Sequence, residues 1–82
     1  MTNSQITVYG VSWCHDCHRS RQFLERHQIP YEWVDIDEDE DGKVFVTQKN
    51  RGNCSVPTIV FADGTILVEP SNTELACKLN LK

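Results

Sequence analysis

The chain has 82 residues, with twelve acidic and eight basic side chains and a formal net charge of −4 at pH 7. This length fits one domain with a modest core, and we expect residues 1–82 to form it. The negative charge argues against a nucleic-acid partner, because phosphate binding needs a basic face. Hydrophobic residues make up 39% of the chain, which excludes disorder, yet no apolar run reaches the roughly 18 residues of a membrane span.

The N-terminal segment, Met1 to Gln5, has neither the basic nor the apolar region of a secretory signal. We therefore expect a cytoplasmic, reducing location. The four cysteines of so short a chain could instead form a secreted two-disulfide framework. Two of them stand in a single C-x-x-C, however, and this favours redox chemistry over a structural framework.

The first half of the chain alternates strand and helix patterns. A short apolar run, residues 6–9, predicts a first strand that ends at Gly10. Helical spacing then runs from Cys14 to about Gln28. On this helix one stripe collects four residues: Ser20, Phe23, Leu24 and His27.

A second strand is predicted over residues 31–36, followed by a run of acids that leads into a second helix ending near Lys49. Acids in a first turn complement the helix dipole, so we interpret residues 35–41 as a solvated loop and helix start. Calcium binding is the alternative, but the spacing of a calcium loop is missing. Gly42 weakens the helix prediction, because glycine costs about 1 kcal/mol relative to alanine inside a helix.

The last part of the chain predicts two strands and a helix. Pro57 opens a third strand over residues 57–61, and Asp63-Gly64 is a hairpin signal that leads to a fourth over residues 65–68. Ser71 to Glu74 has the form of a capping box before a last short helix. The order β-α-β-α-β-β-α predicts an α/β fold with a four-stranded mixed sheet and three helices. Its first two strands are parallel and its last two antiparallel.

The pair Cys14 and Cys17 carries the clearest chemical signal. The first thiol stands at a helix start, where unpaired backbone N–H groups and the helix dipole stabilise a thiolate. The second lies one turn further in, close enough to form a disulfide with it. Both follow the first strand at the carboxyl edge of the predicted sheet, where ligands usually bind. The spacing therefore predicts a redox-active dithiol with Cys14 as its nucleophile.

Other interpretations of the cysteines and their neighbours stay open. Cys14 to His18 also spells the C-x-x-C-H of haem attachment, but the only methionine is Met1 and no export signal is seen. A zinc site would need a second close pair, and Cys54 and Cys77 are far apart in sequence, so we expect no metal. Cys54 is either a third redox thiol or a small loop residue, and Cys77 is expected to be partly exposed without a role.

Three side chains flank the cysteines. We expect His15 and His18 to face solvent and tune the thiolate rather than bind metal. Trp13 is expected to pack beside the site, together with Tyr9.

Five blocks together resemble the glutaredoxins of the thioredoxin superfamily, and within them the mycoredoxin branch. They are Ser12 to Cys17, Val34 to Ile36, Gly52 to Thr58, Phe61 to Gly64, and Pro70-Ser71. The resemblance implies a thioredoxin fold, thiol-disulfide oxidoreductase activity and a resolving role for Cys17. It also implies a cis peptide bond at Val56-Pro57, with the backbone of Val56 pairing with the substrate.

The same resemblance implies the remaining site residues and partners. Substrate-binding roles are expected for Trp13 and His15 near the cysteines and for Ser71 and Asn72 before the last helix. The expected partners are disulfide-containing proteins or mixed disulfides and a low-molecular-weight thiol co-substrate, such as mycothiol or glutathione. No other cofactor, no membrane contact and a monomeric state are expected. The alternative function is an iron-sulfur or metal-binding protein that uses Cys14 as a ligand.

Two departures from the glutathione-using pattern concern charge. Val11 stands where a lysine is common, and Asp16 stands where an aromatic residue is common. Both weaken binding of the anionic glutathione. Residues 69–72, Glu-Pro-Ser-Asn, also differ from the usual Gly-Gly form. The sequence therefore favours a different thiol, such as mycothiol.

Overall fold

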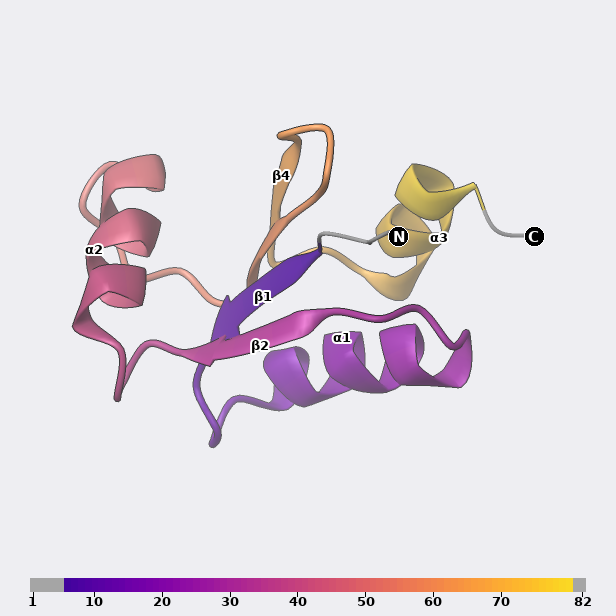
Figure 1. The fold of residues 1–82 in the computed structure, drawn as a ribbon, viewed down its shortest axis with the longest axis horizontal. Coiled ribbons are helices and arrows are strands. Elements are labelled where there is room, and N and C mark those ends of the chain that lie inside the picture. Colours follow the sequence, from indigo (N-terminus) through magenta and orange to yellow (C-terminus); the bar gives the residue numbers. More distant parts are fainter. Residues whose placement is uncertain (1–5, 81–82) are drawn as a thin grey trace.

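The structure, a computed structural model, describes residues 6–80. It confirms the predicted order of elements (Figure 1). These are β1 (Thr7–Gly10), α1 (His15–Arg26), β2 (Glu32–Asp35), α2 (Glu40–Lys49), β3 (Thr58–Val60), β4 (Ile66–Val68) and α3 (Asn72–Leu79). None of the helices described combines the length and the apolarity that crossing a membrane requires. The segment interpreted above as lacking a secretory signal, residues 1–5, lies outside the described part.

The four strands form one mixed sheet in the order β2-β1-β3-β4. Strand β1 runs parallel to β2 and antiparallel to β3, and β3 runs antiparallel to β4. The parallel first pair and the antiparallel last pair are as predicted. Val8 in the centre of β1 lies opposite Trp33 of β2 and Ile59 of β3. The turn that leaves β1 therefore starts from the middle of the sheet.

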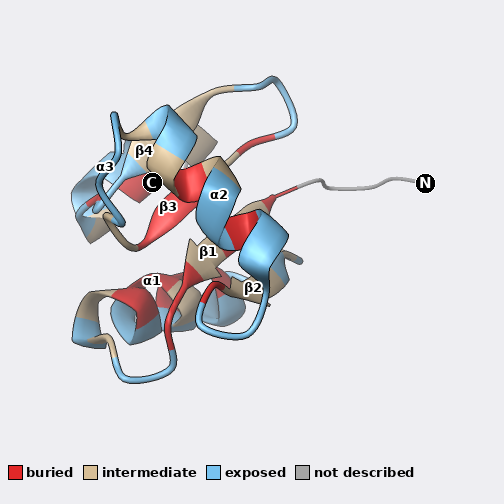
Figure 2. Ribbon diagram, turned by 90° about the vertical axis from the view of Figure 1, so that its left-hand side faces the viewer, coloured by how far each residue is buried: buried red, intermediate tan, exposed pale blue. Residues whose placement is uncertain are grey.

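Two clusters of buried side chains cover the two faces of the sheet. The larger joins β1 and β3 to α1 and α3 and contains Ile6, Val8, Phe23, Leu24, Ile59, Phe61 and Leu75. The smaller, which we call the α2 cluster, consists of Val11, Ile36 and Val46. In Figure 1 helix α2 lies at the left, away from α1 and α3. Figure 2 shows buried residues along β1 and β3 and exposed outer faces on α1 and α2.

Helix α1 buries most of its predicted stripe. Ser20, Phe23 and Leu24 are buried. The fourth stripe residue, His27, is exposed, and the expectation that it belongs to the stripe is wrong. The helix ends at Arg26, so His27 is the C-cap. Its backbone N–H donates to the Phe23 carbonyl oxygen at 3.2 Å, and its ring lies 4.5 Å from the Phe23 ring between centroids.

Helix α2 contains a glycine because it packs closely on the sheet. A Cβ at Gly42 would lie 2.9 Å from Cγ1 of Val34 in β2, nearer than side-chain atoms normally approach. The propensity cost of Gly42 is therefore offset by a close helix-sheet contact. The acidic run is a loop and a helix start, as expected: the Asp39 carboxylate accepts a hydrogen bond from the Gly42 N–H at 3.1 Å, and Glu40 and Asp41 fill the first turn.

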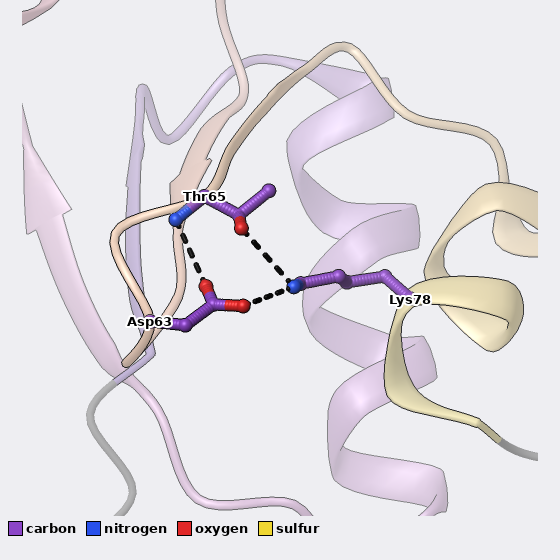
Figure 3. Close-up of polar contacts among 3 residues, drawn as sticks. All are labelled: Asp63, Thr65 and Lys78. Carbon is purple, nitrogen blue, oxygen red and sulfur yellow. Dashed lines mark hydrogen bonds and ion pairs between the residues drawn. The ribbon is translucent and has the colours of Figure 1, made fainter.

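Helix α3 begins with the predicted capping box and is tied to the β3-β4 hairpin. The Ser71 hydroxyl accepts from the Glu74 N–H at 3.1 Å, and the Glu74 carboxylate accepts from the Ser71 N–H at 2.8 Å. Near the other end, Lys78 donates to the Asp63 carboxylate at 2.6 Å and to the Thr65 hydroxyl at 3.1 Å (Figure 3). The turn of the hairpin is thereby attached to the helix.

We expect Asp63→Asn to destabilise the fold modestly at neutral pH and not in strong acid. The hydrogen bond from Lys78, with that from the Thr65 backbone, lowers the pKa of Asp63 below its ordinary value of about 4. Such a group stabilises the fold above its unfolded-state pKa, and this contribution is lost as the pH falls through the folded-state pKa. Urea unfolding of both proteins between about pH 7 and pH 2 measures this. A difference that stays constant over this range would contradict it.

Candidate active site

Cys14 is the N-cap residue of α1. Its backbone is extended, with φ −96° and ψ 119°, and its Sγ accepts a hydrogen bond from the backbone N–H of Cys17 at 3.2 Å. The sulfur thus takes the place that a serine or aspartate oxygen occupies in other N-caps. That N–H and the positive end of the helix dipole both place partial positive charge beside the sulfur. The half-buried Cys14 side chain is therefore placed for nucleophilic attack.

Cys17 lies in the first turn of the same helix and is fully buried. Burial, as the largest cause, and the hydrogen bond to Cys14 together raise the pKa of its thiol to about 12, against a lowering contribution from the Val11 backbone. Cys17 is therefore a neutral thiol at physiological pH. The two thiols therefore differ in accessibility, since Cys14 is half-buried and Cys17 is fully buried. In this structure both are reduced.

Gly10, the last residue of β1, makes room for the Cys17 sulfur. A Cβ at this position would lie 2.5 Å from Sγ of Cys17 and 2.9 Å from the ring of Trp33. From the sequence alone, Gly10 is predicted only to end a strand. Nothing in the local pattern could show its role, because Cys17 and Trp33 come from two other elements.

Trp13 does not pack against the protein as expected. Its side chain is 74% exposed, and its indole N–H donates to the Asp37 carboxylate at 3.0 Å. The expectation for Tyr9 holds, because Tyr9 packs against the α2 cluster and stacks on Phe45 at 4.8 Å. Trp13 is therefore an exposed aromatic surface next to Cys14 in sequence, and its indole is held by the β2-α2 loop.

The residues around the cysteines are mostly exposed. His15 and His18 both face solvent, as expected, and a ring nitrogen of His18 lies 2.6 Å from the Ser12 carbonyl oxygen. Asp16 forms an ion pair with Arg19 at 3.3 Å, and both side chains are about half exposed. Arg19 thus partly offsets the negative charge that Asp16 brings to the site.

A second loop reaches the same region. The Val56–Pro57 peptide bond is cis, as the resemblance implied, and Pro57 is buried. Val56 and Cys14 both pack against the α2 cluster. Neither the N–H nor the C=O of Val56 has a hydrogen-bond partner among residues 6–80. Within the described part of the chain, the loop therefore carries unpaired backbone groups beside the same hydrophobic cluster as Cys14.

Ser71 and Asn72 serve the start of α3. The hydroxyl and N–H of Ser71 are both engaged in the capping box. The side-chain oxygen of Asn72 is buried and has no hydrogen-bond partner among the described residues. No hydrogen bond within residues 6–80 joins either residue to Cys14. Their part in substrate binding stays a prediction.

The remaining polar groups do not form a second centre. Cys54 and Cys77 are both exposed, and within residues 6–80 no three cysteine, histidine or acidic side chains come close enough to hold a metal ion. An open hollow of about 690 Å³ is lined by β2 and the start of α2. A second, apolar hollow of about 390 Å³ is lined by Ile6, Ile29, residues 61–63 after β3, and the end of α3. Neither of these two hollows is lined by Cys14 or Cys17.

A dithiol at a helix N-terminus, on a four-stranded mixed sheet with three helices, defines a thiol-disulfide oxidoreductase with a thioredoxin-like fold. The sequence model of the Glutaredoxin family matches residues 6–67. The chain belongs to the glutaredoxin family.

Relatives and solved structures agree with this. The chain is 40% identical to the "Putative glutaredoxin Rv3198A" of Mycobacterium tuberculosis over 96% of its own length and 94% of that protein. It is 33% identical to Mycoredoxin 1 of Corynebacterium glutamicum, covering 93% of this chain and 94% of the relative. The glutaredoxin of Archaeoglobus fulgidus superposes with a TM-score of 0.74 at 28% identity, covering 93% and 86% of the two chains. A point mutant of the thioredoxin-like protein BC3987 reaches 0.83 at 26% identity, covering 94% and 96%.

Proposed function

We propose that Cys14 is the nucleophile that reduces mixed disulfides and protein disulfides, and that Cys17 is the resolving thiol. The observation that carries this is the hydrogen bond from the Cys17 N–H to the Cys14 sulfur at the start of α1. In the first step the Cys14 thiolate attacks one sulfur of the substrate, an S–S bond forms between them, and the other sulfur leaves as a thiolate.

The second step breaks the new bond in one of two ways. A second thiol molecule can attack the substrate-derived sulfur and regenerate the Cys14 thiolate. Alternatively, Cys17 can attack the Cys14 sulfur, which releases the substrate thiol and leaves a Cys14–Cys17 disulfide. Cys17 must lose its proton for this, and burial raises its pKa to about 12. The route through a small external thiol is therefore favoured for mixed disulfides.

We infer that the external thiol is a low-molecular-weight thiol other than glutathione, with mycothiol as the strongest candidate. Asp16 supports this, because its half-exposed carboxylate would repel the anionic glutathione. Similarity to Mycoredoxin 1 supports it from outside the structure. Val11 supports it less than its position in the sequence indicated. Its side chain is buried in the α2 cluster, so a lysine there would have to turn its charged end out toward solvent.

Comparing reductants tests the function and the co-substrate together. The protein is given a mixed-disulfide substrate together with either glutathione or mycothiol as the reductant. The rate at which the mixed disulfide is reduced is followed with each thiol. Reduction by either thiol supports the oxidoreductase, and faster turnover with mycothiol supports the choice of co-substrate. Failure with both would contradict the proposed function.

We further propose that the chain acts as a monomeric single domain in the cytoplasm, where it transfers electrons from the thiol pool to disulfides.

We expect Asp16→Asn to raise the rate with glutathione severalfold and to leave the rate with mycothiol nearly unchanged. An exposed charge interaction is worth about 0.2–1 kcal/mol, which corresponds to such a change. Glu38→Gln, which removes one acid from the β2-α2 loop, is the matched control. Steady-state rates at low and high salt measure the effect, since salt should reduce it. An equal change with both thiols would contradict the proposed repulsion.

A further inference from the structure

The loop before Pro57 is held by a buried hydroxyl. Thr58, the first residue of β3, is fully buried, and its Oγ1 donates a hydrogen bond to the Ser55 carbonyl oxygen at 2.7 Å. The backbone of Thr58 is fixed by the sheet, where it lies opposite Tyr9 of β1 and Val68 of β4. The hydroxyl therefore anchors the loop to β3, a strand that is paired on both sides.

The end of α2 supports this hydroxyl. Asn50, the C-cap residue of α2, donates from Nδ2 to Thr58 Oγ1 at 3.3 Å and to the Val46 carbonyl oxygen at 2.8 Å. Because the hydroxyl accepts from Asn50, its own proton is directed at Ser55. The chain of contacts runs from helix α2, through Thr58, to the carbonyl that precedes Val56.

One peptide plane connects this contact to the substrate side of the loop. The Ser55 carbonyl and the Val56 N–H belong to the same peptide unit, which is planar and trans, so the two groups point in opposite directions. When Thr58 holds the carbonyl toward the protein interior, the Val56 N–H is turned away from it. That N–H has no partner among the described residues and is free to donate to another chain.

We propose that Thr58 and Asn50 are positioning residues that orient the Val56 N–H toward the backbone of a peptide disulfide, giving such substrates an advantage over small disulfides without a backbone. This inference rests on the proposed function, because it requires that disulfides react at Cys14. It assigns a task to two side chains whose hydrogen bonds, among residues 6–80, do not involve Cys14 or Cys17.

Thr58→Val tests the proposal, because valine keeps the shape of threonine and removes the hydroxyl. The assay compares two substrates that share one half: a peptide cysteine in a disulfide with 2-mercaptoethanol, and bis(2-hydroxyethyl) disulfide, which has no backbone. We expect kcat/KM for the peptide to fall about three- to tenfold, mainly through KM, with the small disulfide unaffected. Thr58→Ser retains the hydroxyl and should restore the peptide rate.

If Thr58 only stabilised the fold, the two substrates would not be affected differently. Equal losses with both substrates, or no loss with the peptide, would overturn the proposal. Asn50→Ala is a second variant in case Thr58→Val folds poorly, and a smaller loss confined to the peptide is expected for it. Urea unfolding of each variant separates stability from selectivity. Wild-type protein that reduced neither substrate would instead contradict the proposed function itself, which keeps the two failures distinct.

Discussion

Cys14→Ser is expected to abolish reduction of every disulfide, whereas Cys17→Ser keeps most of the activity on mixed disulfides with a small thiol. Only Cys14 combines a helix N-terminus with an accessible sulfur. Cys17 is buried and protonated, and a second small thiol can replace it in the resolving step. Turnover of a small mixed disulfide and of a protein disulfide by each variant measures the contrast, and the protein disulfide should need both cysteines.

The chain offers matched controls for this experiment. Cys54→Ser and Cys77→Ser remove exposed thiols outside the C-x-x-C and should leave both activities unchanged. Equal loss of small-disulfide activity in Cys14→Ser and Cys17→Ser would show a mechanism that always needs two thiols. Loss in Cys54→Ser would show that the loop before Val56 contributes a third redox thiol.

Gly10→Ala is expected to destabilise the fold by about 1–3 kcal/mol, a cost typical of overpacking in a core. The added methyl group would lie 2.5 Å from the Cys17 sulfur and 2.9 Å from the Trp33 ring, so at least one of these must move. Displacement of the sulfur should also slow disulfide formation between Cys14 and Cys17. The free energy of unfolding from urea titration and the rate of oxidation measure the two effects.

A double-mutant cycle isolates the sulfur contact. Cys17→Ala removes the atom that Gly10→Ala would strike, so the cost of Gly10→Ala should be smaller in that background. An equal cost in both backgrounds would assign the effect to Trp33 alone. It would also remove the reason to connect Gly10 with the resolving cysteine.

The sequence predicted the order of elements and the position of Cys14, because both depend on local patterns. Helical spacing, the proline before β3 and the capping box at Ser71 each report the conformation of neighbouring residues. The placement of the Cys14 thiol at a helix start also follows from the pattern of neighbouring residues. The cis bond at Val56–Pro57 was implied only by resemblance, because most X-Pro bonds are trans.

What the sequence did not predict depends on contacts between distant segments. The space at Gly10 exists because α1 and β2 bring Cys17 and Trp33 to the end of β1. Trp13 was expected to pack, but the carboxylate of Asp37, 24 positions away, holds its indole N–H in an exposed place. The only sequence signal for the Thr58 contact was a threonine directly after Pro57, at the start of a predicted strand. Its partners, however, become visible only once α2 is placed.

The strand order also bears on how molecules of this protein meet one another. Strand β2 is at one margin of the sheet and leaves the hydrogen-bonding groups on its outer side without a neighbouring strand. An open margin of this kind invites a second copy to extend the sheet, which leads toward aggregation. Here the margin carries Glu32 and Asp35, and the acidic loop continues directly from it. A second copy approaching the same margin would meet like charge, and this repulsion opposes pairing at this edge of the sheet.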